Sequence, residues 1–481
     1  MSYKHGIYAS EIATSLVPMT ETSAGLPVVF GTAPVHLASA ATKVNTPVLC
    51  YKYSEAVAAF GYSDDWKKYT LCEFMKSHFA LFNMAPVVFV NVLDASTHKK
   101  AVASKSVTIT NGTALLSEAV LLDTLKVKLT AEGDALVLNT DYTAAYNDTE
   151  QVVITPLTGG KLANATTLIA SYDTVDASLV VHDDIVGGVD ITTGANEGLE
   201  LVNEIYPRFG LIPGIILAPG WSDNTAVAAV MKAKETNING HFKAISICDV
   251  PTGTIKKYSD VSAWKNENNF VDSGQILCWP KVALSGVQYH LSTQLAGIIC
   301  VLDAAHDDIP YWSPSNQSLQ ADSSVLEDGT EIYLGSDSAA YLNGQGIYTA
   351  LNFIGGWKGW GNRTTAYPSN TDVKDAFIAI RRMFNWVGNT LITSFWSKID
   401  NPTNKRLIET ITDSANIWLN GLAAKGCLLG GRVEFRSDEN TDTNLMDGKI
   451  YFHVYITPPS PARDIEFVQE YDTAYISTLF S

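Results

Sequence analysis

The stretch Gly25-Leu-Pro-Val-Val-Phe-Gly31 is apolar between two glycines, and residues 87–92 repeat the pattern as Val-Val-Phe-Val-Asn-Val. Short runs that are apolar throughout and bounded by turn residues are typical of buried strands. Helical patterns over 54–60 and 71–82 separate the two runs. The order of strand, helix and strand predicts a parallel sheet with helices on both faces.

The same order returns after residue 210. We expect three strands and three helices in alternation: strand 211–217, helix 222–235 with Ser222-Asp223 as its cap, strand 244–248, helix 260–268, strand 275–278 and helix 292–305. Together these elements predict one α/β core over residues 23–95 and 188–360.

Residues 96–187 differ in character from the segments on either side. Short alternating runs such as 106–110 and 126–130 are separated by Asn-Gly, Glu-Gly-Asp and Gly-Gly turns. This pattern predicts a small all-β domain inserted into a surface loop of the α/β core. Its role as a solubilising decoration or as an adhesive domain stays open.

The C-terminal part predicts a third unit, an α+β domain over 361–463. Amphipathic patterns over 371–396 and 404–425 indicate two helices, and 431–436 with 449–457 indicate a hairpin. Residues 464–471 alternate as a further strand candidate, and the chain ends in an apolar stretch at 475–480. We therefore expect extended arms at both termini, over 1–22 and 464–481.

Composition limits the classes of function. The 481 residues suit about three domains, and only 17% of them are charged, which favours surface covered by neighbouring subunits. A net charge of -17 argues against gripping nucleic-acid phosphates directly. Glu11 interrupts any export signal, and no apolar stretch is long enough to insert in a membrane, so we expect a soluble chain. The six cysteines form no C-x-x-C pair.

Charge is distributed unevenly. Residues 371–436 hold nine Lys or Arg against six Asp or Glu, a net charge of +3 that leaves -20 for the rest of the chain. A basic helical module in an acidic chain predicts a docking face for a partner, although ordinary helix-surface charge explains many single residues.

Motifs for catalysis are missing. The sequence has no H-E-x-x-H, G-x-S-x-G or phosphate-binding loop motif, and Gly159-Gly160-Lys161-Leu162 lacks the Ser or Thr of such a loop. His306-Asp307-Asp308 and His182-Asp183-Asp184 could seed metal sites, but each falls where a loop is expected. We therefore predict no catalytic residue, no metal site, no cofactor and no enzyme activity.

Glycine and tryptophan are concentrated in Gly355-Gly-Trp-Lys-Gly-Trp-Gly-Asn-Arg-Thr364. Glycines allow close backbone approach, while large aromatic side chains can anchor a tight loop or form a sugar platform. We expect a hinge or interface loop made by Trp357, Trp360, Gly361, Asn362, Arg363 and Thr364.

Over residues 1–95 and 186–481 the chain resembles the contractile tail sheath proteins of bacteriophages and of phage-derived contractile injection systems. Three features carry the resemblance: Tyr3-Lys-His-Gly-Ile-Tyr8 leading into the first strand, the Trp360-Gly-Asn-Arg-Thr364 loop, and the C-terminal order of helix, helix, hairpin and tail with Asp464-Ile-Glu-Phe-Val468. The tryptophan-glycine loop is the most specific of them.

The resemblance implies a subtilisin-like α/β core without a protease triad. It also implies a structural role: hexameric rings stack in a helical lattice around a tail tube and contract to drive the tube through a bacterial envelope. The implied partners are other copies of the chain, the tail tube protein, and baseplate and tail terminator proteins. The implied location is a virion tail or injection particle assembled in the bacterial cytoplasm.

The resemblance also assigns roles to residues. The arms would join neighbouring subunits through Tyr3, Gly6, Ile7, Tyr8, Ile465, Phe467, Val468, Ile476 and Phe480. The basic module would face the tube through Lys398, Lys405 and Arg406, and residues 96–187 match the variable outer domain of many sheaths. Two alternatives stay open: a static filament or shell protein, and a tail-associated carbohydrate-binding or hydrolytic protein.

Overall fold

A nine-stranded sheet forms the centre of the molecule. The computed structural model describes residues 17–480, and the strand order is β17-β20-β19-β14-β13-β12-β1-β3-β2. The six central strands are parallel. At one edge β2 (Val48–Cys50) pairs antiparallel with β3, and at the other β20 (Trp357–Trp360) pairs antiparallel with both β19 and the outermost strand, β17 (Gln317–Ser318). The central strands are β1 (Pro27–Gly31), β3 (Val87–Asn91), β12 (Ile215–Leu217), β13 (Ile245–Asp249), β14 (Gln275–Cys278) and β19 (Ile347–Asn352). The strands predicted within 25–31, 87–92, 211–217, 244–248 and 275–278 are thus confirmed.

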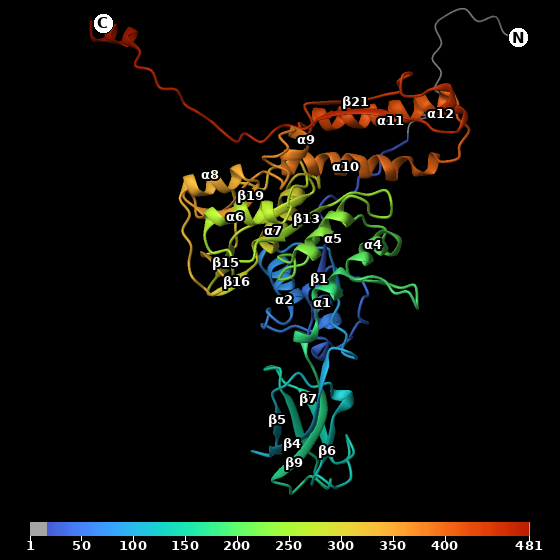
Figure 1. Ribbon diagram of the computed structural model, residues 1–481, viewed down its shortest axis with the longest axis vertical. Helices are drawn as coiled ribbons and strands as arrows, with labels where there is room; N and C mark the ends of the chain where they lie inside the picture. Colours follow the sequence, from blue (N-terminus) through green and yellow to red (C-terminus); the bar gives the residue numbers. More distant parts are fainter. Residues whose placement is uncertain (1–16, 481) are drawn as a thin grey trace, which may run out of the picture.

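Helices cover both faces of this sheet (Figure 1). Neighbouring strand residues alternate between two cores, so Val28 packs in one and Val29 in the other. On the Val29 side lie α1 (Tyr53–Phe60), α2 (Thr70–Met75) and α7 (Leu291–Ala305). On the Val28 side lie α4 (Val202–Phe209), α5 (Thr225–Glu235), α6 (Tyr258–Glu267) and α8 (Ser336–Gly344).

Two predicted helices differ in detail. The helix over 71–82 is α2 followed by a π-helical segment, Lys76–Leu81. The cap of α5 is Asn224, whose side chain accepts from the backbone N–H groups of Ala226 and Val227, and not Ser222-Asp223. Ser222 is buried and instead accepts from the backbone N–H of Asp249 at 3.2 Å.

Residues Lys99 to Val175 form two three-stranded antiparallel sheets, with strand orders β4-β9-β6 and β5-β8-β7. The strands are β4 (Lys99–Thr108), β5 (Ala114–Leu116), β6 (Lys126–Lys128), β7 (Tyr142–Tyr146), β8 (Val152–Pro156) and β9 (Thr167–Val175). Their own apolar core includes Leu116, Val127 and Ile154. Lys99 pairs with Val175, so the chain leaves and re-enters the α/β core at adjacent points.

Short elements complete the core. They are β2 (Val48–Cys50), α3 (His182–Val186), β10 (Gly188–Val189), β11 (Asn196–Glu197), β15 (Lys281–Leu284), β16 (Val287–Tyr289), β17 (Gln317–Ser318), β18 (Ser323–Val325) and β20 (Trp357–Trp360).

The C-terminal unit lies at the opposite end of the molecule from the inserted sheets (Figure 1). It contains α9 (Val373–Ala376), α10 (Ile378–Phe395), α11 (Lys405–Ala424), β21 (Gly430–Glu434), α12 (Asp442–Met446) and β22 (His453–Thr457). The predicted hairpin is confirmed, because β21 pairs with β22. The prediction of one helix over 371–396 is wrong: Phe377 is extended, with φ -105° and ψ 130°, and pairs with Arg363, which separates α9 from α10.

The tail after Pro458 has no strand among its described residues, so the strand expected over 464–471 does not form in a single chain. It runs away from the body and carries a short 3-10 helix, Thr473–Phe480, near its end (Figure 1). A strand needs a hydrogen-bonded neighbour, and the isolated chain places none beside this segment.

Candidate assembly surfaces

The C-terminal tail presents apolar side chains to solvent. Ile465, Phe467 and Val468 are 70%, 86% and 85% exposed, and Ile476 is also exposed. Burying side chains of this size stabilises a protein by about 1.5–3 kcal/mol each, so exposed ones on an extended segment indicate a missing partner. Tyr3, Gly6, Ile7 and Tyr8 lie outside the described residues, and so does the side chain of Phe480.

The glycine-tryptophan segment is mostly strand. Trp357 and Trp360 begin and end β20, which pairs with β19, so the expectation of a loop there is wrong for these two residues. Gly359 is required by packing, because a Cβ would lie 1.8 Å from the Tyr348 hydroxyl. The tight contact explains why β20 carries a glycine between its two tryptophans.

The residues after β20 fasten the core to the C-terminal unit. Asn362 O accepts from Ile378 N at 3.0 Å, and Thr364 N donates to Ala376 O at 3.1 Å. The Thr364 hydroxyl donates to Asp375 O at 2.6 Å. Three hydrogen bonds to backbone groups of Asp375, Ala376 and Ile378 make this a fixed joint within the subunit.

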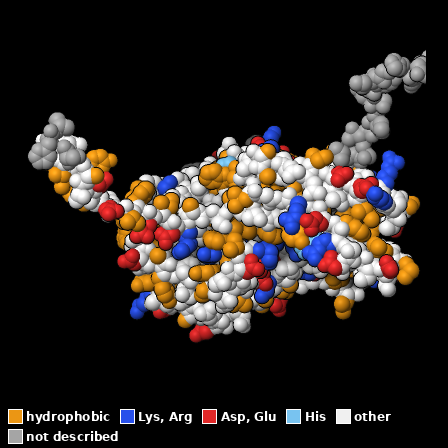
Figure 2. All heavy atoms as spheres, turned by 90° about the horizontal axis from the view of Figure 1, so that it is seen from above, with side chains coloured by type: hydrophobic (Ala, Val, Ile, Leu, Met, Phe, Trp, Pro, Cys, Tyr) orange, Lys and Arg blue, Asp and Glu red, His pale blue; other side chains and the backbone are white. Residues whose placement is uncertain are grey.

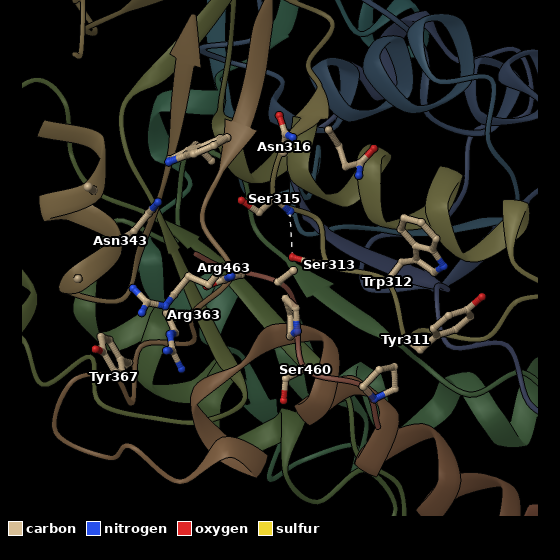
Figure 3. A pocket seen from close by; sticks show the side chains of 18 residues that line it. Tyr311, Trp312, Ser313, Ser315, Asn316, Asn343, Arg363, Tyr367, Ser460 and Arg463 are labelled. Atoms are coloured by element: carbon tan, nitrogen blue, oxygen red, sulfur yellow. Dashed lines mark hydrogen bonds between the residues drawn. The ribbon is translucent and has the colours of Figure 1, made fainter. Parts of the chain in front are cut away.

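A groove of about 650 Å³ lies beside this joint (Figure 3). Arg363 and Arg463 line one side of it, and Tyr311 and Trp312 lie on the other. The Arg363 guanidinium carbon lies 4.3 Å from the ring centroid of Tyr367, and it also stacks on Phe377 at 3.7 Å. Burial and the positive charge of Arg463 lower the pKa of Arg363, although an arginine stays protonated.

A buried ion pair joins α10 to the core. The Arg382 guanidinium donates to both oxygens of Asp303 on α7, and both side chains are at least 95% buried. Burial raises the pKa of Asp303, and the charge of Arg382 opposes that rise. Nearby, the Asn385 amide donates to Ala244 O at 2.9 Å. Asn389 bonds both backbone groups of Lys243, at 3.0 and 2.9 Å.

Residues 17–24 lie against α10 and α11 of the same chain. Val17 N donates to the Ser414 hydroxyl and Thr20 N to the Ser394 hydroxyl, both at 2.8 Å. The Trp386 indole donates to Thr22 O at 2.5 Å. Part of the segment expected to form the free N-terminal arm is therefore docked on its own C-terminal unit.

The three predicted tube-facing residues lie together in the sequence around the turn between α10 and α11. Lys405 and Arg406 open α11 and are exposed, whereas Lys398 is half-buried. Lys405 forms an ion pair with Glu409 at 3.4 Å, but Lys398 and Arg406 have no carboxylate partner within residues 17–480. Viewed from above, the C-terminal unit shows basic, acidic and apolar side chains interspersed (Figure 2). Basic side chains on this face therefore lie among acidic and apolar ones and form no separate basic patch.

A cleft of about 760 Å³ lies at the carboxyl ends of the parallel strands. Glu73 accepts from His290 N and contacts His290 Nδ1, each at 2.7 Å, while Asp249 accepts from Ser292 N at 3.0 Å and from its hydroxyl. These carboxylates therefore satisfy the N-terminus of α7. The charge of His290 lowers the pKa of Glu73, and Glu73 raises that of His290, in both cases against burial.

Ser292 at the start of α7 is buried, and its hydroxyl donates to Asp249, which lines the cleft. His306 and Asp307 lie where α7 runs into a loop, as the sequence indicates. Across residues 17–480 no group of His, Cys, Asp and Glu is arranged to hold a metal ion. Within the same range, no helix is long and apolar enough to cross a membrane.

The fold is that of contractile tail sheath proteins. The sheath of an extracellular contractile injection system, PVC, in its contracted state superposes with a TM-score of 0.59 at 13% identity, covering 98% of this chain and 99% of that one. The contracted helical sheath of the anti-feeding prophage superposes with a TM-score of 0.55 at 13% identity, covering 98% and 100%.

A relative identified by sequence similarity is also a tail sheath protein. The tail sheath protein of Burkholderia phage BcepMu is 27% identical over 493 aligned positions, covering 99% of this chain and 98% of the relative. No protein-family model matches the sequence. The resemblance to contractile tail sheath proteins inferred from the sequence is confirmed, and it extends over the whole chain.

Proposed function

We propose that this protein is the structural subunit of a contractile tail sheath, polymerising as hexameric rings around a tail tube and contracting to drive that tube through a bacterial envelope. The observation that carries the proposal is similarity to sheath proteins over the full length, two of them in contracted assemblies. The exposed apolar tail supports it, because such a segment needs a neighbour.

The proposed arrangement assigns each part a side of the sheath. The C-terminal unit, 361–463, faces the tube and the inserted domain, 96–187, faces outward, which agrees with their positions at opposite ends of the molecule (Figure 1). The core, 23–95 and 188–360, forms the sheath wall with a subtilisin-like arrangement. The arms, 1–22 and 464–481, join neighbours by adding strands to the β21–β22 hairpin.

Contraction in this proposal needs no nucleotide or other cofactor. The free energy is stored as a difference in packing between an extended and a compact lattice. The buried Arg382–Asp303 pair and the Asn389 contacts hold the C-terminal unit on the core, so each subunit would move as one body. The conformational change between the two lattices would take place in the tail after Pro458, because this segment makes few contacts with the rest of its own chain.

The partners follow from the same proposal: further copies of the chain, a tail tube protein, and the baseplate and terminator proteins at the two ends. Assembly would take place in the bacterial cytoplasm, and the finished protein would lie in a virion tail or injection particle. The relatives are structural sheath proteins, which is consistent with a protein that is not an enzyme.

Electron microscopy of the purified chain tests the proposal. The expected result is hollow tubes or rings with sixfold symmetry, formed without nucleotide. A chain that stays monomeric at high concentration by light scattering would contradict it. A static filament or shell protein, the second candidate, would show the same single lattice with and without the tube.

A further inference from the structure

We propose that the cleft at the carboxyl ends of the parallel strands binds an aliphatic polyamine, a flexible ligand with several ammonium groups. The proposed sheath function gives this cleft no role, so the inference goes beyond that function. The cleft measures about 760 Å³, a volume typical of small-ligand pockets. In open α/β sheets, small ligands usually bind at this edge of the sheet.

Acidic side chains outnumber basic ones along the cleft. Six carboxylates line it against two lysines and one histidine: Asp64, Asp65, Glu73, Asp223, Asp249 and Glu327 against Lys67, Lys281 and His290. Both lysines form ion pairs with the same carboxylate, Glu327. Because two of the positive charges are used by one carboxylate, a surplus of negative charge remains, and the cleft favours a cationic occupant.

Asp223 is the carboxylate in the cleft that lacks a partner. It lies after β12 and is half-buried, and no other residue within 17–480 donates a hydrogen bond to its carboxylate or forms an ion pair with it. Burial raises the pKa of Asp223, whereas the charges of His290 and His182 act in the opposite direction. A ligand that donates hydrogen bonds and carries positive charge would stabilise the ionised carboxylate, and an ammonium group does both.

A buried hydroxyl without a partner is an independent sign of a ligand. Thr252 lines the cleft on the loop after β13 and is 4% exposed, yet its Oγ1 has no hydrogen-bond partner within residues 17–480. Buried polar groups are nearly always hydrogen-bonded, so an unpaired hydroxyl in the wall of a cleft indicates a missing donor or acceptor. An ammonium group has three donors and can reach a hydroxyl and a carboxylate together.

The cleft also offers apolar surface to the carbon chain of such a ligand. Trp66 and Val287 line it, and Val287 is 45% exposed. The Trp66 ring packs on Tyr289 with ring centroids 5.0 Å apart, which fixes its plane. Alkyl chains pack on apolar surface while their charged ends stay hydrogen-bonded, and an aromatic face attracts cations. This combination suits a polyamine better than a metal ion, for which residues 17–480 provide no set of ligands.

The cleft lies at the edge of the sheet from which the inserted domain extends (Figure 1). The inserted sheets follow β3, whose carboxyl end lies at the same edge as those of β12 and β13, because all three strands are parallel to β1 or to each other. The Ser63 hydroxyl donates to Glu150 of the inserted domain at 2.9 Å, directly before the cleft residues 64–67. If the inserted domain faces outward, as proposed above, the cleft lies near the outer side of the sheath.

Isothermal titration calorimetry of the full chain with spermidine tests the proposal. Physiological ionic strength screens the general attraction of a polyamine to a chain with a net charge of -17. We expect saturable binding of one spermidine per subunit and no binding of an uncharged diol of similar length. Asp223→Asn removes the unpaired charge and should weaken spermidine binding by about tenfold or more.

The matched control is Asp413→Asn, an exposed carboxylate on α11 with the same change of charge, which should leave spermidine binding unchanged. A second variant, Thr252→Val, replaces the unpaired hydroxyl with a methyl group. It should weaken spermidine binding several-fold while the melting temperature stays the same or rises, because the hydroxyl has no partner within the subunit to lose. Circular dichroism checks that each variant folds.

Two results would overturn the proposal. One is the absence of saturable spermidine binding by the wild type. The other is equal affinity of the Asp223→Asn and Asp413→Asn variants, whether unchanged or weakened, since binding would then reflect net charge alone. Weaker binding by Asp223→Asn and Thr252→Val, with Asp413→Asn unchanged, would support the proposed site. A chain that binds spermidine in this way but never polymerises would contradict the sheath function alone, because the titration does not depend on assembly.

Discussion

At the scale of single residues, one buried ion pair contributes to the joint between the core and the C-terminal unit. The side chains of Arg382 and Asp303 are 4% and 5% exposed. Each charged group has therefore lost its contact with water, and the ion pair compensates for that loss. Removing one partner leaves an uncompensated buried charge, whereas replacing both side chains by apolar groups leaves no charge buried.

Asp303→Asn or Arg382→Met should therefore lower the free energy of unfolding by about 3–5 kcal/mol, as removal of one partner of a buried pair usually does. The double variant Asp303→Leu with Arg382→Met should lose less than either single change. Urea denaturation followed by circular dichroism measures all three. Single variants within about 0.5 kcal/mol of the wild type, the range of ordinary surface changes, would contradict this role.

The Glu73–His290 pair makes stability depend on pH. The pKa of His290 is raised above 6.5, so its contribution is complete below pH 6.5 and is lost as the pH rises through the folded value. The pKa of Glu73 is lowered below 4.5, so its contribution is present above pH 4.5 and is lost as the pH falls through the folded value. Asp223, Asp249 and Lys281 also face this pair.

The stabilisation by this pair should thus be largest between about pH 4.5 and 6.5 and should fade on either side. The measurement is the difference in melting temperature between the wild type and His290→Gln across pH 4 to 9. A difference that stays constant over this range would show that the pair contributes through packing alone.

At the scale of elements, the sequence predicts most of the core because its strands are apolar on both faces. The run at 87–92 can be recognised as a strand from the local sequence alone, since a buried parallel strand is apolar on both faces. The sequence predicts the structure less well where contacts between residues far apart in the chain determine the local conformation. Phe377 is extended because it pairs with Arg363, and residues 17–24 dock through serines and a tryptophan that carry no local signal. The Arg382–Asp303 pair was likewise not predictable, because it joins residues 79 positions apart.

Deleting residues 464–481 should leave a folded subunit that does not polymerise. The described side chains from Ile465 to Tyr471 are exposed and contribute little to the fold, while the proposed lattice depends on them. Circular dichroism measures folding, and electron microscopy measures assembly. Unfolding of the shortened chain, or tubes formed in normal yield, would each contradict the proposed role of the arm.

Replacing residues 99–175 with a short Gly-Ser linker should preserve tube formation. Lys99 and Val175 are paired neighbours, and the two inserted sheets have a separate apolar core, so the junction can be closed without strain. The same microscopy measures the outcome. Loss of tubes in a variant that still folds would place this domain in the lattice.

At the scale of the whole molecule, docking on the tube is proposed to rest on many weak contacts. Each exposed charge contributes about 0–1 kcal/mol, but the repeat of subunits along a tail multiplies the sum. Reversing Lys398, Lys405 and Arg406 to Glu should favour empty or prematurely compact sheaths over tube-filled extended ones. Lys43→Glu with Lys52→Glu, exposed positions on the core, serves as a control. If the reversed variant formed extended sheaths in normal yield and with normal salt resistance, the docking surface would lie elsewhere on the subunit.

The central claim is that one subunit forms two lattices and that the tube selects between them. Cryo-electron microscopy of the chain produced alone and produced with its tube protein tests this claim most directly. We expect a wide, compact helical sheath without the tube and a narrower, extended sheath around it, each built from sixfold rings of the same subunit. A single lattice with identical rise and rotation in both preparations would contradict it.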